Sequence, residues 1–220
     1  MLEWPLDGSG WDYGLALTKE AVDLSCGELI DISIQGFCTD ELLDHIVLRS
    51  SKLKRLCLLN CHRITDGALS QAVKRVPQLE KLHLSDVIVD AQVIEVIGRN
   101  CPQLKSFKMN NVDDDLNDEH ALAIASNMPQ LSHLELTTSD IGDNGLEAIL
   151  NGCPHLQYLD VRMCFNLDLD GYLGKMCMER IKDFKHGSSD SELYVQISDV
   201  EDFSEDDMYD DFSESDFFID

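Results

Sequence analysis

A short leucine pattern recurs along most of the chain, and it limits what the chain can fold into. Its clearest copy spans residues 53–58 and reads LKRLCL. In an extended segment, alternation would turn Leu56 and Leu58 to one side and Cys57 to the other. Residues 66–75 follow after a turn, with apolar side chains at helical spacing. One unit of the pattern therefore predicts a strand, a turn and a helix.

Six copies of the pattern start 24 to 27 residues apart, a regularity that chance does not produce. The copies are Leu29/Ile32/Ile34, Leu53/Leu56/Leu58, Leu79/Leu82/Leu84, Leu104/Phe107/Met109, Leu131/Leu134/Leu136 and Leu156/Leu159/Val161. A period of roughly 20 to 29 residues with these leucines is the signature of a leucine-rich-repeat solenoid. Strands pack ~4.8 Å apart and helices ~10 Å apart, so the array must curve with its strands inside. The sequence therefore predicts an α/β horseshoe with parallel strands on the concave face and helices on the convex face.

Three segments are expected along the chain. Residues 1–15 are punctuated by glycine and predict an irregular lead-in. Residues 16–186 predict a solenoid of about six repeats plus partial end repeats, beginning with a helix at 16–24 and ending in a frayed strand near Ile181 and Phe184. The remaining helices are expected at residues 40–49, 66–75, 90–100, 118–127, 143–152 and 170–178. Residues 187–220 contain acids and aromatics but no lysine or arginine, which predicts a disordered tail, either solubilising or interacting.

An aspartate recurs where each helix should begin. These residues are Asp40, Asp66, Asp90, Asp118, Asp143 and Asp170. A carboxylate at this place accepts hydrogen bonds from free helix N–H groups and suits the positive end of the helix dipole. Helix capping is favoured over metal binding, because ladder-like spacing distributes the aspartates along the solenoid and does not bring them to one ion.

Eight cysteines are expected to be free thiols, because a chain with a large apolar core and no secretory signal does not need a disulfide scaffold. Cys57 and Cys61 beside His62 resemble a fragment of a zinc site. No second ligand pair stands at metal-site spacing, so packing is the preferred interpretation. We expect no metal and no cofactor.

Composition and motifs exclude several classes of function. A formal net charge of −25 disfavours nucleic-acid binding. The sequence lacks a glycine-rich phosphate loop, a nucleophile elbow and a metal-ligand pair on one helix face, so we do not expect an enzyme. It has neither a membrane-spanning apolar run nor the start of a signal peptide. A soluble protein of the cytoplasm, the nucleus or both is expected.

The repeat carries a particular signature: CPHL at residues 153–156, LKRLCLLNC at 53–61 and ITDGAL at 64–69. This signature resembles the cysteine-containing repeats of F-box proteins. The segments AVDLSCGELIDISI and TDELLDHIVLRSSKLKRLCL resemble plant F-box/LRR-repeat proteins in particular. The resemblance implies a substrate-recognition role in an SCF ubiquitin ligase, where the F-box binds a Skp-type adaptor and the repeats bring a protein substrate for degradation.

Two interpretations of ligase attachment stay open. An F-box is a helical module of roughly 45 residues, and residues 1–15 have neither the length nor the apolar pattern for one. We therefore expect the 220-residue chain alone not to bind a Skp-type adaptor. The alternative function is a stand-alone interaction protein, or a decoy that holds substrate without ubiquitin transfer.

Protein partners are expected to dock on side chains that point outward from the strands. The candidates in one row are Arg55, Lys81, His133 and Tyr158, and those in the next are Cys57, His83, Lys108, Glu135 and Asp160, with Arg162 beyond. Because aromatic residues and arginine are enriched among interface hot spots, Tyr158, Arg55 and Arg162 are the strongest candidates.

Overall fold

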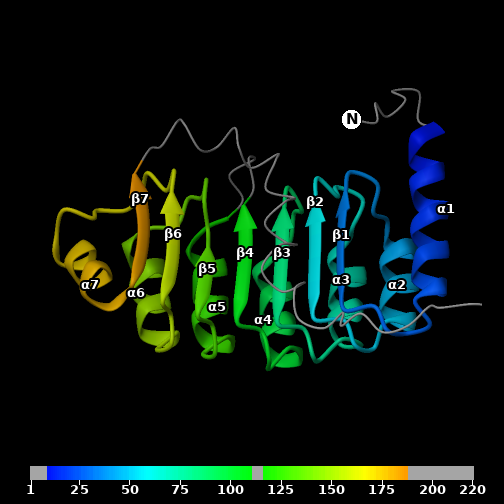
Figure 1. Cartoon of the computed structure of the whole chain (residues 1–220). Helices are drawn as coiled ribbons and strands as arrows, with labels where there is room; N and C mark the ends of the chain where they lie inside the picture. Colours follow the sequence, from blue (N-terminus) through cyan, green and yellow to red (C-terminus); the bar gives the residue numbers. More distant parts are fainter. Residues whose placement is uncertain (1–8, 111–115, 188–220) are drawn as a thin grey trace, which may run out of the picture. The chain divides into compact units, whose positions relative to one another are not determined.

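A computed structural model describes residues 9–110 and 116–187 of the chain, in which helices and strands alternate (Figure 1). The strands are β1 (Asp31–Gln35), β2 (Arg55–Leu59), β3 (Lys81–Ser85), β4 (Ser106–Asn110), β5 (His133–Glu135), β6 (Tyr158–Arg162) and β7 (Asp183–Gly187). The helices are α1 (Ser9–Leu24), α2 (Asp40–Arg49), α3 (Asp66–Val73), α4 (Ala91–Asn100), α5 (Asp118–Asn127), α6 (Asp143–Gly152) and α7 (Tyr172–Arg180). The chain divides into residues 1–187 and 188–220, and the predicted tail lies outside the described residues.

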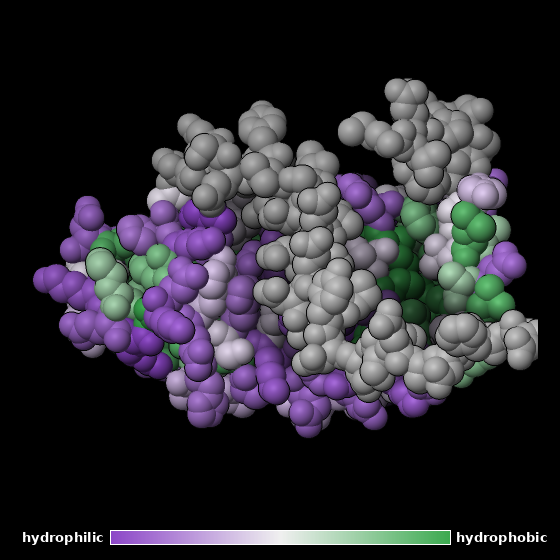
Figure 2. Space-filling view, viewed as in Figure 1, coloured by the Kyte–Doolittle hydropathy of each residue, from purple (hydrophilic) through white to green (hydrophobic). Residues whose placement is uncertain are grey.

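The strands form one parallel sheet in the order β1 to β7, so each strand pairs with the next along the chain. Figure 1 shows the helices together on one side of this sheet. Every pairing joins equivalent positions, such as Leu56 with Leu82 and Leu82 with Phe107. This arrangement confirms the predicted leucine-rich-repeat solenoid. We call the side of the sheet opposite the helices the open strand face; it is the side viewed in Figure 2, where hydrophilic residues are purple.

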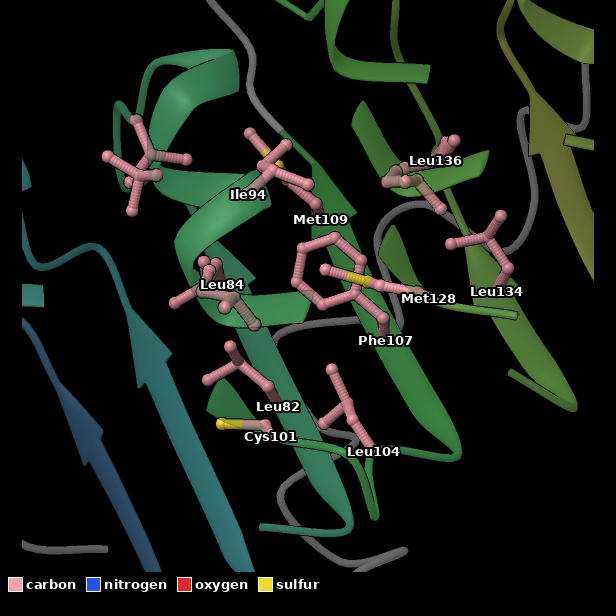
Figure 3. Close-up of a cluster of buried hydrophobic side chains, with 14 of the residues drawn as sticks. Leu82, Leu84, Ile94, Cys101, Leu104, Phe107, Met109, Met128, Leu134 and Leu136 are labelled. Carbon is pink, nitrogen blue, oxygen red and sulfur yellow. The ribbon is translucent and has the colours of Figure 1, made fainter. Parts of the chain in front are cut away.

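The frame residues form the core between sheet and helices. Leu82, Leu84 and Phe107 are almost fully buried and meet Ile94 of α4 in one cluster (Figure 3). Fully burying a Leu or Phe side chain stabilises the fold by ~1.5–3 kcal/mol. A single repeat cannot cover its own apolar face. The frame residues are therefore buried only when neighbouring repeats stack against one another.

The first helix is longer than predicted. It begins at Ser9, whereas the lead-in was expected to stay irregular through residue 15. Gly14 lies within this helix, where a Cβ would lie 3.4 Å from the ring of Phe37, at ordinary van der Waals distance. At the other end, β7 pairs with β6 over five residues, where a frayed strand was predicted.

Four of the recurring aspartates lie in the first turn of their helices, as predicted: Asp40, Asp66, Asp118 and Asp143. The prediction that these carboxylates cap their own helices is wrong. The N-cap positions are occupied by Thr39, Thr65, Asp90, Asn117, Gly142 and Gly171, and Asp90 makes no side-chain cap bond. Asp118 stands one place later and accepts a hydrogen bond at 2.7 Å from the backbone N–H of Gly142, in the next repeat. Asp143 accepts one from Asp168 N–H at 2.9 Å in the same way. Asp118 and Asp143 therefore each join one repeat to the next.

Glycine also lets neighbouring helices approach closely. A Cβ at Gly98 of α4 would lie 2.6 Å from the Asn127 carbonyl oxygen of α5. A Cβ at Gly152 of α6 would lie 2.7 Å from both the carbonyl carbon and the Cα of Ala125 of α5. Real Cβ atoms essentially never come under 3.0 Å. These two positions therefore set the spacing of three consecutive helices.

Candidate functional site

Outward-pointing residues of the strands lie in two rows across the open strand face. The first row, in register, is Asp31, Arg55, Lys81, Ser106, His133, Tyr158 and Asp183. The second row is Ser33, Cys57, His83, Lys108, Glu135, Asp160 and Lys185. Nine of the ten candidate residues stand in these rows, and Arg162 ends β6 two places after Asp160. The parallel register therefore brings all ten to one face.

Glu135 is the centre of a polar cluster on β4 and β5. Its carboxylate accepts a hydrogen bond from His133 Nε2 at 2.8 Å and lies 3.0 Å from Lys108 Nζ. Burial raises the pKa of a carboxyl, but the bond from His133 and the charge of Lys108 outweigh it and lower the pKa of Glu135 to about 2. Glu135 is therefore ionised at neutral pH and its charge is satisfied within the chain. It is better suited to fixing His133 than to binding a partner.

Aromatic rings stack along the first row. The rings of His133 and Tyr158 are parallel within 5°, with centroids 3.9 Å apart. Lys185 Nζ lies 5.5 Å from the centroid of Tyr158, within the range of a cation–π contact. Burial, followed by the nearby charges of Glu135 and Asp160, raises the pKa of Tyr158. Tyr158 is therefore un-ionised at neutral pH, and this part of the open strand face presents an ordered aromatic surface.

Arg162 is engaged within the chain. Its Nη2 donates to Asp160 Oδ2 at 2.6 Å, and its Nε lies 3.0 Å from both carboxylate oxygens. The Asp160 side chain is fully buried and that of Arg162 is 12% exposed. Removing one member of a buried pair leaves an uncompensated charge and costs about 3–5 kcal/mol. Arg162 is therefore a weaker candidate for direct partner contact than its residue type suggested.

The two basic candidates at the start of the first row differ in their surroundings. Arg55 Nε lies 2.5 Å from Asp31 Oδ2, so its charge is already paired. Lys81 is exposed and forms no salt bridge with any residue in the described ranges 9–110 and 116–187. Glu80, next to it, pairs with Lys54 at 2.9 Å. Lys81 is therefore the cation of this row that is most available to a partner.

Cys57 and His83 form a thiol–imidazole contact in the second row, with 3.3 Å between Sγ and Nδ1. Burial raises the pKa of Cys57 to about 11. Burial and the charge of Lys108 lower the pKa of His83 to about 3. Both groups are therefore neutral at pH 7, unlike the ionised cysteine of a nucleophilic site.

The remaining cysteines serve mainly as buried hydrogen-bond donors. Cys61 Sγ lies 3.2 Å from its own strand's Leu59 carbonyl, and Cys164 Sγ lies 2.9 Å from Leu136 O of the preceding repeat. All eight are free, and only Cys26 is exposed. Across residues 9–110 and 116–187, no three His, Cys, Asp or Glu side chains are placed to hold a metal ion. Within the same ranges, no helix has the length and apolar character needed to cross a membrane.

Sequence reasoning missed five residues that share the two rows: Asp31, Ser33, Ser106, Asp183 and Lys185. Asp31 and Ser106 stand between frame residues at the same offset as Arg55, so the repeat itself could have indicated them. Asp183 and Lys185 were omitted because only two apolar residues marked the last strand. Lys185 completes the stack on Tyr158, and Asp31 neutralises Arg55.

Comparison with known proteins agrees with the leucine-rich-repeat fold. A family model described as FBD-associated F-box protein At5g56370, LRR repeats, matches residues 28–122. Putative F-box/LRR-repeat protein 23 of Arabidopsis thaliana is 43% identical over 185 residues, which cover 81% of this chain and 41% of that protein. F-box protein SKIP19 of the same plant is 41% identical over 209 residues, covering 90% of this chain and 69% of that protein.

A solved structure shares the fold. The match is a chain of the yeast Rad7 and Elc1 complex, with a TM-score of 0.55, 15% identity, and coverage of 82% of this chain and 59% of the matched chain. The repeats and the relatives together indicate a non-catalytic interaction module. The resemblance found in the sequence is confirmed, and the chain belongs to the plant F-box/LRR-repeat family.

Proposed function

We propose that this chain is the substrate-recognition part of an SCF-type ubiquitin ligase subunit, and that it binds a protein substrate on the open strand face. The observation that carries the proposal is the first row, where the exposed Lys81 and the stacked His133 and Tyr158 lie on one ordered surface. Family membership supports the ligase role. Such a protein would act in the cytoplasm or nucleus.

Side chains on this face divide into those held by the chain and those available to a partner. Arg55, Glu135 and Asp160 are each paired within the chain. Lys81, His133 and Tyr158 retain exposed or partly exposed side chains. Interfaces gain most of their energy from a few aromatic and cationic anchors surrounded by near-neutral contacts. The available residues are of this type, and the paired ones hold the surface rigid.

Attachment to a ligase is tested by co-purification with a Skp-type adaptor. Within residues 9–110 and 116–187, each helix and strand belongs to a whole or partial repeat. A stable specific interface needs ~1,000 Å² of buried surface. We expect that the 220-residue chain does not bind the adaptor. A version extended by an F-box should bind it with one-to-one stoichiometry. Adaptor binding by the unextended chain would contradict this expectation.

The second candidate function is a stand-alone interaction protein that holds its partner without ubiquitin transfer. The extended version separates the two candidates, because both would bind the same substrate on the repeats. If the extended chain assembles with the adaptor and promotes ubiquitin transfer to a co-purified partner, the ligase role is supported. If it assembles but the partner stays unmodified, the stand-alone role is favoured.

A further inference from the structure

One small residue interrupts the large side chains of the first row. Ser106 lies between Lys81 on β3 and His133 on β5. Neighbouring strands are about 4.8 Å apart, so Lys81 and His133 leave the sheet about 10 Å apart. Only a hydroxymethyl group stands between them. Because the next two rings of the row stack at 3.9 Å, the position over Ser106 has the width of one further ring.

Both neighbours of this position have chemistry that suits an aromatic ring. His133 stacks on Tyr158 through the ring face directed toward β6, so its other face is directed toward Ser106. The His133 side chain remains 36% exposed, and its hydrogen bond to Glu135 fixes the ring. Lys81 stands on the far side without a salt bridge to any described residue. An ammonium over a ring face is attracted by the ring quadrupole.

The far end of the open strand face already shows the complete arrangement. There, Lys185 Nζ lies over one face of Tyr158, and His133 covers the other face. A ring over Ser106 would have the same environment, with the Lys81 ammonium on one face and His133 on the other. An aliphatic group would lack the attraction to the cation. A carboxylate would pair with Lys81 but leave the face of His133 uncovered.

We propose that the position over Ser106 receives an aromatic side chain of the protein partner. This inference rests on the proposed function and adds the chemistry of the partner's anchor residue. The partner's Phe, Tyr or Trp ring stacks on His133 and lies against the Lys81 ammonium, which extends the row by one ring. Aromatic anchors of this kind dominate the energy of many protein interfaces.

Matched variants at two positions test the proposal. Ser106→Tyr fills the position from within the chain, whereas Ser106→Ala leaves it open. His133→Phe keeps a stacking face without the hydrogen bond to Glu135, whereas His133→Ala removes the face. We expect Ser106→Tyr and His133→Ala to weaken binding of an aromatic ligand about tenfold or more. Ser106→Ala and His133→Phe should keep it within about threefold. Far-UV circular dichroism checks that each variant is folded.

The probes are peptides selected from a random library on the wild-type chain alone, with no selection for or against any variant. The proposal expects one essential aromatic residue in each surviving peptide, whose replacement by alanine weakens binding about tenfold. Lys81→Glu reports separately whether a selected peptide uses the open strand face. If peptides lose binding in Lys81→Glu but bind Ser106→Tyr as well as wild type, the aromatic anchor is wrong while the proposed function stands. If no selected peptide responds to Lys81→Glu, the proposed function itself is contradicted.

Discussion

Gly152→Ala tests the close packing of the convex helices. Gly152 is the last residue of α6, and an added Cβ would lie 2.7 Å from two backbone atoms of Ala125 in α5. The obstacle is main chain, so no side-chain rotation can relieve it, and the two helices must separate. Overpacking of this kind typically costs about 1–3 kcal/mol. Alanine has the higher helix propensity, but that gain is at most about 1 kcal/mol and is smaller at a helix end.

We expect Gly152→Ala to lower the free energy of unfolding by about 2 kcal/mol, measured by urea unfolding with far-UV circular dichroism. For a chain of this size the thermal midpoint should fall by about 4–8 °C. Gly67→Ala is the matched control, because its Cβ would meet only Thr65 Oγ1, at 3.9 Å. That variant should be as stable as the wild type or more stable by up to about 1 kcal/mol. Equal stability of both variants would refute the packing argument.

Three further predictions concern ionisation, inter-repeat bonding and thiol exposure. The pKa of Glu135 is about 2 in the folded chain against an ordinary 4.5, so its stabilisation is present above about pH 4.5 and is lost as pH falls through 2. Urea unfolding should therefore show that the difference in free energy of unfolding between wild type and Glu135→Gln shrinks by up to about 3 kcal/mol from pH 4.5 to pH 2. A difference that stays constant with pH would contradict the ionised cluster around Glu135. Asp118→Ala removes the acceptor of the Gly142 N–H and should cost about 1–3 kcal/mol in the same assay, whereas an unchanged midpoint would mean that the bond contributes nothing. A thiol reagent should modify Cys26 rapidly and the other seven cysteines only after unfolding, and a fast phase that persists in Cys26→Ser would show that a second thiol is open.

The repeat frame predicted the fold well because its physical basis is local. Alternation in a strand decides which residues enter the core, so Leu82 and Phe107 could be placed from spacing alone. The same alternation identified the outward rows, and their register follows once the strands are parallel. The pairing of side chains with one another could not be predicted in this way. The buried pair of Asp160 and Arg162 requires both side chains to turn toward each other, which spacing does not encode.

Two gaps in the sequence analysis have the same origin in interactions between repeats. The aspartates were assigned to their own helices, but Asp118 bonds to the next repeat. Gly152 gave no signal in the sequence, because a glycine at a helix end is equally typical of a simple stop. In each case the residue is explained by its neighbouring repeat, which a pattern within one repeat does not contain.

The central claim is that the open strand face is the surface that binds the protein partner. The most direct measurement places a photo-crosslinking amino acid at Lys81 and, in separate proteins, at Glu147 of α6 and Lys175 of α7, which are exposed on the helices. Proteins that co-purify with the unmodified chain from plant cells serve as partners. We predict cross-linking from Lys81 at a yield well above that from either helix position. Cross-linking from the helix positions, with none from Lys81, would contradict the account.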